Sequence, residues 1–141
     1  MTSVVNTKFA LKPVVAALAL ATAAGAAYAA PTPNQMPGAG QFMAASLTGA
    51  VQVNGGGALP LNTTITGLVN GSRIDVAGKV VLNWGVTSVV DPLNPHGFNL
   101  GSNATLFFGA DPVSGLASVL NVDVSGNPSQ IYGNLISTAA P

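Results

Sequence analysis

Cysteine and glutamate are both absent from this sequence of 141 residues. Without cysteine there are no disulfide bonds and no thiolate ligands for a metal, so stability has to come from packing and backbone hydrogen bonds. Without glutamate, catalysis by a pair of carboxylates would depend on the aspartates, and their scattered spacing indicates no pair. The four aspartates are Asp75, Asp91, Asp111 and Asp123.

Positive charge is equally scarce, with four Lys and Arg residues in the whole chain. Lys8 and Lys12 belong to an N-terminal leader described below. Without that leader, Arg73 and Lys79 stand against four aspartates, which gives a formal charge of −2. Binding of nucleic acid requires a cluster of Lys and Arg that displaces counterions from the phosphates. The sequence therefore excludes nucleic acid as a partner.

Groups suited to catalysis or metal binding are also few. His96 is the only histidine, and a metal site would need two or three further ligands converging on it. The sequence has no G-x-S-x-G elbow for a serine nucleophile. The glycine-rich segment 54–58 lacks the Lys and Ser or Thr of a phosphate loop and indicates a tight turn. We therefore predict that the protein is not an enzyme and expect no metal, cofactor or small-molecule substrate.

What the sequence does contain begins with the pattern of a secretory signal peptide. Lys8 and Lys12 precede an uncharged apolar run over residues 13–27, and Ala27-Tyr28-Ala29 supplies a small-x-small cleavage site. The run is shorter than the roughly 20 apolar residues that span a bilayer. We predict that residues 1–29 are a signal peptide cleaved before Ala30, and that the protein is exported through the inner membrane to the cell surface or medium.

The rest of the chain has the composition of a β protein, rich in Val, Ile, Leu, Thr, Asn and Gly. Residues 30–45 are rich in Pro and Gly and predict an irregular lead-in, and residues 46–141 predict one all-β domain. Turn residues separate the expected strands, which cover 47–53, 61–68, 73–82, 86–90, 104–108, 116–124 and 131–136. Strand spacing alone allows a sandwich, a barrel or a β-solenoid.

One expected strand alternates clearly between apolar and polar residues. In residues 120–124, Leu120 and two valines lie on one face, whereas Asn121 and Asp123 lie on the other. This pattern predicts a half-buried strand.

Several short motifs, in order along the chain, resemble the secretion domain of filamentous-haemagglutinin-type exoproteins, known as the two-partner secretion domain. The segment 36–41 is similar to the family's "P-x-x-G-Q" opening, and 98–101 is similar to its "F-N-I-G". The segment 128–135 is close to its "P-S-Q-I-Y-G-x-L" signature. The residues that carry the resemblance are Asn83, Trp84, Phe98, Asn99, Gly101, Leu120, Asn121, Pro128, Ser129, Gln130, Ile131 and Gly133.

The resemblance implies a right-handed parallel β-helix, that is, a β-solenoid, with a capped N-terminal end. It also implies recognition by an outer-membrane transporter, and a role in secretion or cell-surface adhesion. Residues 85–97 are longer than the family's usual connection and predict an intruding loop or an extra hairpin. The sequence stops before the rest of the family's domain, so we expect an uncapped terminal coil.

An uncapped coil exposes unpaired backbone groups that invite a partner. One alternative is therefore a subunit of an extracellular fibre, as in a biofilm matrix, built by end-to-end stacking or strand donation. A second is an adhesin module that binds carbohydrate or a receptor through exposed aromatic residues. Phe107 and Phe108 are adjacent, so in a strand one points inward and the other outward. We expect the outward one to contact a partner.

Overall fold

The computed structural model describes residues 28–45, 49–110 and 117–138. The predicted signal peptide lies outside this part of the chain except for its last two residues. The described residues form seven strands, β1 (Gly40–Ala45), β2 (Ala50–Val53), β3 (Thr64–Ile65), β4 (Arg73–Trp84), β5 (Thr105–Ala110), β6 (Ala117–Asp123) and β7 (Asn134–Thr138). Within these ranges, no helix is long and apolar enough to cross a membrane.

The long strand β4 organises the fold. Gly78 lies near its middle with a φ of 64°, a conformation that costs glycine little because it has no Cβ. The half before Gly78 pairs antiparallel with β2 along one edge and parallel with β5 along the other. The half after Gly78 pairs antiparallel with β1 and parallel with β6. Both halves of β4 are therefore covered on both edges.

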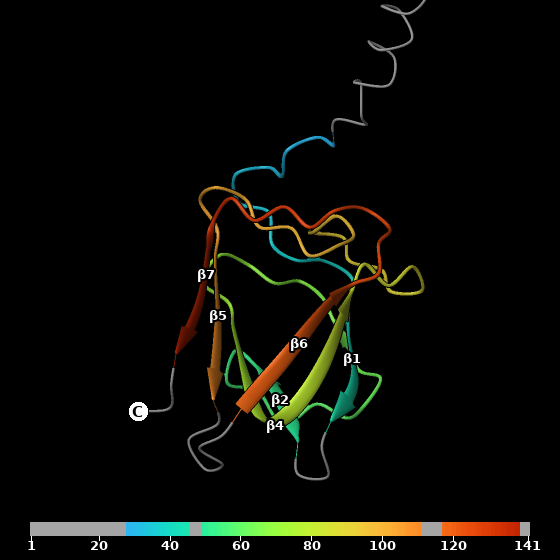
Figure 1. Ribbon diagram of the computed structural model, residues 1–141, viewed down its shortest axis with the longest axis vertical. Coiled ribbons are helices and arrows are strands. Elements are labelled where there is room, and N and C mark those ends of the chain that lie inside the picture. The colour runs from blue at the N-terminus through green and yellow to red at the C-terminus, as the bar shows by residue number, and fades with distance from the viewer. Residues whose placement is uncertain (1–27, 46–48, 111–116, 139–141) are drawn as a thin grey trace, which may run out of the picture.

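The parallel strands extend the sheet from the two halves of β4. Strand β5 pairs with the first half of β4, and β7 pairs with β5 in turn. Figure 1 shows β7 outside β5, and β6 beside the second half of β4. The loops 85–104 and 124–133 gather at one end of the molecule (Figure 1), where Leu100 and Ile131 form a parallel bridge. The predicted all-β class is confirmed, and the sheet is mixed and open.

The core forms where the strands turn their alternate residues inward. In β4, Ile74, Val76, Val80, Leu82 and Trp84 are buried, as the two-residue period of a strand requires. Each such side chain stabilises the fold by roughly 1.5–3 kcal/mol through removal of apolar surface from water. The other strands and loops add Met36, Phe42, Val51, Ile65, Leu68, Phe98, Leu100, Ala104, Leu106 and Phe108. The core therefore draws on every part of the described chain up to β5.

The predicted strand over residues 86–90 is wrong, and of the two alternatives predicted for residues 85–97, a loop or an extra hairpin, the structure has the loop. Residues 85–97 form a loop of turns and bends without a strand. The amide of Val89 bonds to the carbonyl of Val86 in a tight turn, and Asp91 accepts hydrogen bonds from the amides of Leu93 and Asn94 at 3.0 and 3.1 Å. These local bonds use groups that a hairpin would need for pairing.

The lead-in predicted to be irregular ends in a strand, β1. Phe42 is buried in the core, and β1 pairs along the second half of β4 with a bulge between Phe42 and Ala44. In contrast, the predicted strand over 61–68 shortens to Thr64–Ile65, and the one over 131–136 begins at Asn134. Gly40 and the alanines of β1 have low β propensity, so pairing with β4 decides this strand.

Candidate functional site

Trp84 lies at the centre of the residues that carry the family resemblance. Its ring is fully buried at the end of β4 and packs against Phe98, with the ring centroids 5.5 Å apart and tilted by 42°. The indole N–H donates a hydrogen bond to Oδ1 of Asn121 at 2.9 Å. A Cβ on Gly40 would lie 2.6 Å from the Trp84 ring, so the N-terminal motif over residues 36–41 meets Trp84 here.

The alternation of β6 exists, but its polar face points inward. Asn121 and Asp123 pair in register with the fully buried Leu82 and Trp84 of β4. Leu120, on the other face, is 58% exposed. A contact with another strand explains this orientation of β6, because the buried indole N–H of Trp84 needs an acceptor and Asn121 supplies it. An apolar side chain at that position would leave the indole without a partner.

Asp123 joins β6 to two loops through one carboxylate. Its Oδ2 accepts hydrogen bonds from the amide of Phe98 and the hydroxyl of Ser129, both at 2.8 Å. Its Oδ1 accepts one from the amide of Ser125 at 2.9 Å. Partial burial raises the pKa of this carboxyl, but the hydrogen bonds from Ser125, Phe98 and Ser129 together outweigh burial and hold the pKa of Asp123 below its ordinary value.

The two loops are also joined directly, between the "F-N-L-G" and "P-S-Q-I-Y-G" motifs. Oδ1 of Asn99 accepts a hydrogen bond from the Gln130 amide at 2.9 Å. The amide of Leu100 bonds to the Gln130 carbonyl, and the Tyr132 amide bonds to the Leu100 carbonyl. The two motifs are far apart in the sequence but lie side by side in the fold.

Glycines allow these loops to approach closely. A Cβ on Gly133 would lie 2.3 Å from the carbonyl oxygens of Gly101 and Ala104. A Cβ on Gly101 would lie 1.9 Å from the carbonyl oxygen of Thr32. The three segments around 32, 101 and 133 therefore pack backbone against backbone, which only glycine permits.

The remaining motif residues do not join this network in the same way. Asn83 is half-buried opposite Gln41 and Val122 in the strand register. Pro128 is exposed in the loop, and Ile131 is 43% exposed although its backbone forms the bridge to Leu100.

Phe107 and Phe108 point to opposite faces of β5, as expected. Phe108 is buried in the core, whereas Phe107 is only half-buried. Phe107 lies opposite Arg73 on one side and Ile136 on the other. The outward residue, for which we predict a partner contact, is therefore Phe107. Trp84, Phe98 and Phe108 are buried, which removes them from a carbohydrate-stacking surface.

Asn94 is a site residue that sequence reasoning missed. Its buried side chain accepts a hydrogen bond from the Met36 amide at 3.1 Å and donates one to the Leu68 carbonyl at 3.0 Å. It ties the loop 85–97 to the start of the chain, next to Gly38, whose Cβ would meet the Asn94 carbonyl at 2.6 Å. The turn-like sequence around His96 gives no signal of this role.

The groups that could support chemistry are dispersed. His96 is exposed in its loop, and Asp91 binds backbone amides rather than a neighbouring acid or histidine. In the ranges 28–45, 49–110 and 117–138, no three acidic or histidine residues gather into a possible metal site. Asp111 lies outside these ranges.

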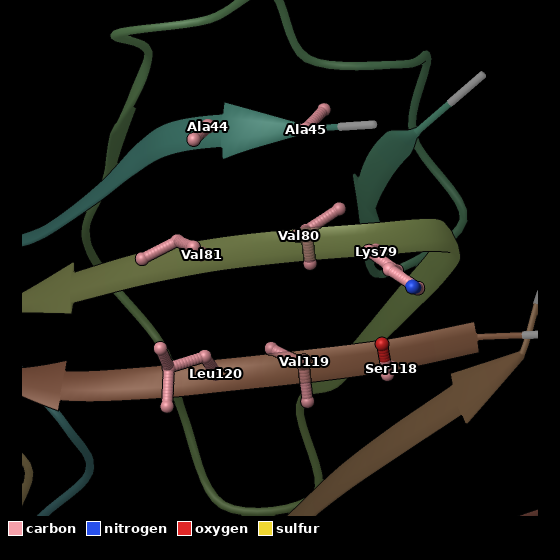
Figure 2. A pocket seen from close by; sticks show the side chains of 8 residues that line it. All are labelled: Ala44, Ala45, Lys79, Val80, Val81, Ser118, Val119 and Leu120. Carbon is pink, nitrogen blue, oxygen red and sulfur yellow. The ribbon is translucent and has the colours of Figure 1, made fainter. Parts of the chain in front are cut away.

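A shallow apolar groove of about 470 Å³ lies across β1, β4 and β6, and Figure 2 shows its lining side chains. They are Ala44, Ala45, Lys79, Val80, Val81, Ser118, Val119 and Leu120. Lys79 and Ser118 are the polar members of this set. Small-molecule sites fix their ligand with several converging polar groups, and two neighbouring side chains on a shallow surface do not form such a set.

The end of the molecule formed by β6 and β7 is open. Among the described strands, β6 pairs with β4 alone and β7 pairs with β5 alone, so each has one free edge. The two strands also carry exposed apolar side chains. Leu120 of β6 is 58% exposed, and Leu135 and Ile136 of β7 are 44% and 37% exposed. Leu135 lies in register beside the fully buried Leu106, so the row of core residues continues out to this surface.

Comparison with known proteins gives no relative. No protein-family model, no curated protein and no solved structure matches the chain.

Proposed function

We propose that this chain is an exported surface or extracellular protein with a domain of the two-partner secretion type, which acts in secretion and cell-surface adhesion. On this proposal, β4, β5, β6 and β7 belong to the first coils of a right-handed parallel β-helix, and β1, β2 and β3 cap its N-terminal end. The parallel pairing of β4 with β5 and β6, and of β5 with β7, supports this arrangement.

One observation carries the proposal. The motifs that resemble the secretion domain converge on a single hydrogen-bonded network around Trp84 and Asp123. Residues with a shared structural role are expected to meet in the fold, whereas chance matches scattered along the chain have no reason to do so. The network stabilises the loops at one end of the proposed coils. The partner implied by the resemblance is an outer-membrane transporter, and the outward face around Phe107 is available for it.

The test is localisation. The full chain is expressed in a Gram-negative host, with and without the outer-membrane transporter of a filamentous-haemagglutinin system, and the medium, cell surface and periplasm are assayed separately. We expect processing before Ala30 in both hosts and release to the surface or medium only with the transporter. Retention in the periplasm in both hosts would contradict transport, and an unprocessed chain in the cytoplasm would contradict export.

Phe107→Ala and Phe108→Ala provide matched variants for the same assay. Loss of the buried Phe108 side chain is expected to cost about 3–5 kcal/mol of stability. Loss of the half-buried Phe107 side chain is expected to lower transport or adhesion while the folded state persists. If Phe107→Ala leaves both unchanged, this residue is not the contact.

A second candidate function is self-association, and the free edges of β6 and β7 favour it. A strand edge with unpaired N–H and C=O groups is a template for another strand. The extracellular fibre expected from the sequence is one form of this function, built by end-to-end stacking or strand donation. Electron microscopy of the medium and the cell surface, with sizing of the purified chain, tests it.

A further inference from the structure

The open end formed by β6 and β7 has the shape of a step. On the first half of β4 the parallel stack continues through two more strands, β5 and β7. On the second half it continues through one strand, β6. Strand β7 therefore extends one strand spacing, about 4.8 Å, beyond the level of β6. Figure 1 shows the two last strands on neighbouring sides of the molecule.

The unpaired backbone groups on this step can be identified by alternation. The amide of Asn134 bonds to the Ala104 carbonyl, toward β5, and the amide of Val124 bonds to the Trp84 carbonyl, toward β4. Successive residues of a strand direct their N–H and C=O groups to opposite edges. Leu135 and Ser137 of β7, and Val119 and Asn121 of β6, therefore direct theirs to the free edges.

These edges lack the features that keep edge strands apart. Neither β6 nor β7 contains Lys, Arg or Pro, the residues that commonly block edge-to-edge pairing. Asp123 carries the only charge in the two strands, and three hydrogen bonds within its own chain hold it. Two copies of this surface can therefore meet without repulsion between like charges along the paired edges.

The opposite end of the molecule is covered along β2 and along the first part of β1. Along the outer edge of β2, the carbonyls of Val51 and Val53 accept hydrogen bonds from the amides of Leu59 and Gly56. Along the outer edge of β1, Phe42 bonds to Thr63 and Asn62, and β3 pairs with the start of the strand. Head-to-tail stacking would need a free edge along the whole of this end, and the covered edges of β2 and of the first part of β1 do not provide one.

We infer that the open end binds the open end of a second copy of this chain in a closed two-fold dimer, in which β7 of each copy pairs antiparallel with β6 of the other. A two-fold axis perpendicular to the direction of strand stacking turns the second copy over. This rotation reverses the direction of its strands, and it places β7 of the second copy against β6 of the first. Each copy thus fills the step of the other, as an isologous interface requires. The inference rests on the second candidate function above.

Among the described strands, none pairs with the outer edges of β6 and β7. The exposed Leu120 of β6 and Ile136 of β7 lie on the outward faces of the two strands and become cross-strand neighbours in the dimer. Their substitution leaves the core of the single chain intact, because both already face solvent in part.

The experiment measures the mass of the exported, purified chain by sedimentation over a wide concentration range. We expect a monomer–dimer equilibrium. The variant Leu120→Lys/Ile136→Lys brings like charges together and is expected to raise the dissociation constant about tenfold, through two unfavourable cross-strand pairs. Val90→Lys is the matched control, at an apolar residue that is 82% exposed in the loop 85–97. This variant is expected to leave the dissociation constant unchanged.

A charge swap tests which strands pair. In Leu120→Lys/Ile136→Glu, reciprocal pairing of β6 with β7 brings opposite charges together and restores the dimer. Pairing of β7 with β7 would bring two glutamates together and would not restore the dimer. A variant that stays monomeric would therefore overturn the reciprocal arrangement.

Other results overturn the inference as a whole. A monomer at every concentration excludes the interface, and filaments exclude a closed dimer. Circular dichroism confirms that each variant is folded. The transporter-dependent release described above is measured on the same variants, so a monomer that is still released contradicts the dimer and leaves the proposed secretion function standing.

Discussion

At the scale of single residues, Asp123 has the densest set of interactions in the network. Its carboxylate accepts hydrogen bonds from the loop 85–104 and from two residues of the loop 124–133, which follows its own strand. Burial alone would raise its pKa, and the hydrogen bonds lower the pKa below the ordinary value. A lowered folded-state pKa means that the ionised carboxylate stabilises the fold above the ordinary pKa, and that this contribution is lost as the pH falls through the folded-state pKa.

Asp123→Asn is therefore expected to cost about 1–3 kcal/mol at neutral pH, the range for a charged hydrogen-bonding group. The difference from the unsubstituted chain should narrow as the pH falls below about 4, where an aspartate begins to protonate. Urea unfolding followed by the fluorescence of Trp84, the only tryptophan, measures the loss of stability at neutral pH and its change with pH. A difference that stays constant down to acid pH would show that the charge of Asp123 is not involved.

Asp75→Asn is the matched control, because it removes the same charge. Asp75 accepts a hydrogen bond from Nε of Arg73 at 2.7 Å, within one strand, with the arginine and aspartate side chains 38% and 16% exposed. Asp123 accepts three such bonds, so this variant should cost less than Asp123→Asn, about 1 kcal/mol as for a partly exposed pair.

The Trp84–Asn121 pair gives a second prediction at this scale. Asn121→Leu leaves a buried indole N–H without an acceptor, which is expected to cost about 1–3 kcal/mol. In the background of Trp84→Phe, which has no N–H, the same change should cost less. Chemical unfolding followed by circular dichroism completes the double-mutant cycle. Equal costs in the two backgrounds would argue against the hydrogen bond.

At the scale of elements, the sequence predicts the strands whose own residues favour a strand. The Val- and Ile-rich segment 73–82 becomes β4, and 104–108 becomes β5, because β-branched and aromatic residues pack well on a pleated surface. The sequence does not predict β1, whose pairing depends on β4. The strand that it predicts at 86–90 is wrong, because Asp91 and the buried Asn94 hold turns in this segment instead.

The orientation of β6 shows why alternation is an incomplete guide. The pattern predicts two faces correctly, but it does not say which face is inside. Asn121 and Asp123 face inward because an indole N–H and a backbone amide already need acceptors there. That demand arises from Trp84 and Phe98, which belong to other elements, so residues 120–124 by themselves carry no sign of it.

Packing between successive loops makes Gly133 a sensitive position. In Gly133→Ala the new Cβ would meet two carbonyl oxygens at 2.3 Å, and neither backbone segment can move without breaking bonds to its neighbours. We expect a loss of about 1–3 kcal/mol or more, as for other overpacked sites. Gly57→Ala, where nothing lies within 4 Å, should change stability by less than about 0.5 kcal/mol. Thermal unfolding of both variants compares them, and similar melting temperatures would contradict the close approach.

At the scale of the whole molecule, the residues that carry the resemblance contribute part of the network, and the sequence predicts an uncapped terminal coil but not the stepped shape of the open end. The residues that carry the resemblance include Trp84 and Phe98, whose rings pack together, and Asn99 and Gln130, which share a hydrogen bond. The stepped open end is different in kind. It follows from the number of strands stacked on each half of β4, and no residue or local pattern encodes that number.

Hydrogen exchange tests this arrangement over the whole molecule. At concentrations that keep the chain monomeric, the amides of β4 should exchange slowest, because both of its edges are paired and their opening requires global unfolding. The amides of Leu135 and Ser137, on the free edge of β7, should exchange fastest among the strand residues. Raising the concentration should slow these two amides and those of Val119 and Asn121 while β4 stays unchanged. If the amides of β7 remain fast at high concentration, a second copy does not cover this edge; if β4 exchanges as fast as β7, β4 is not the centre of the fold.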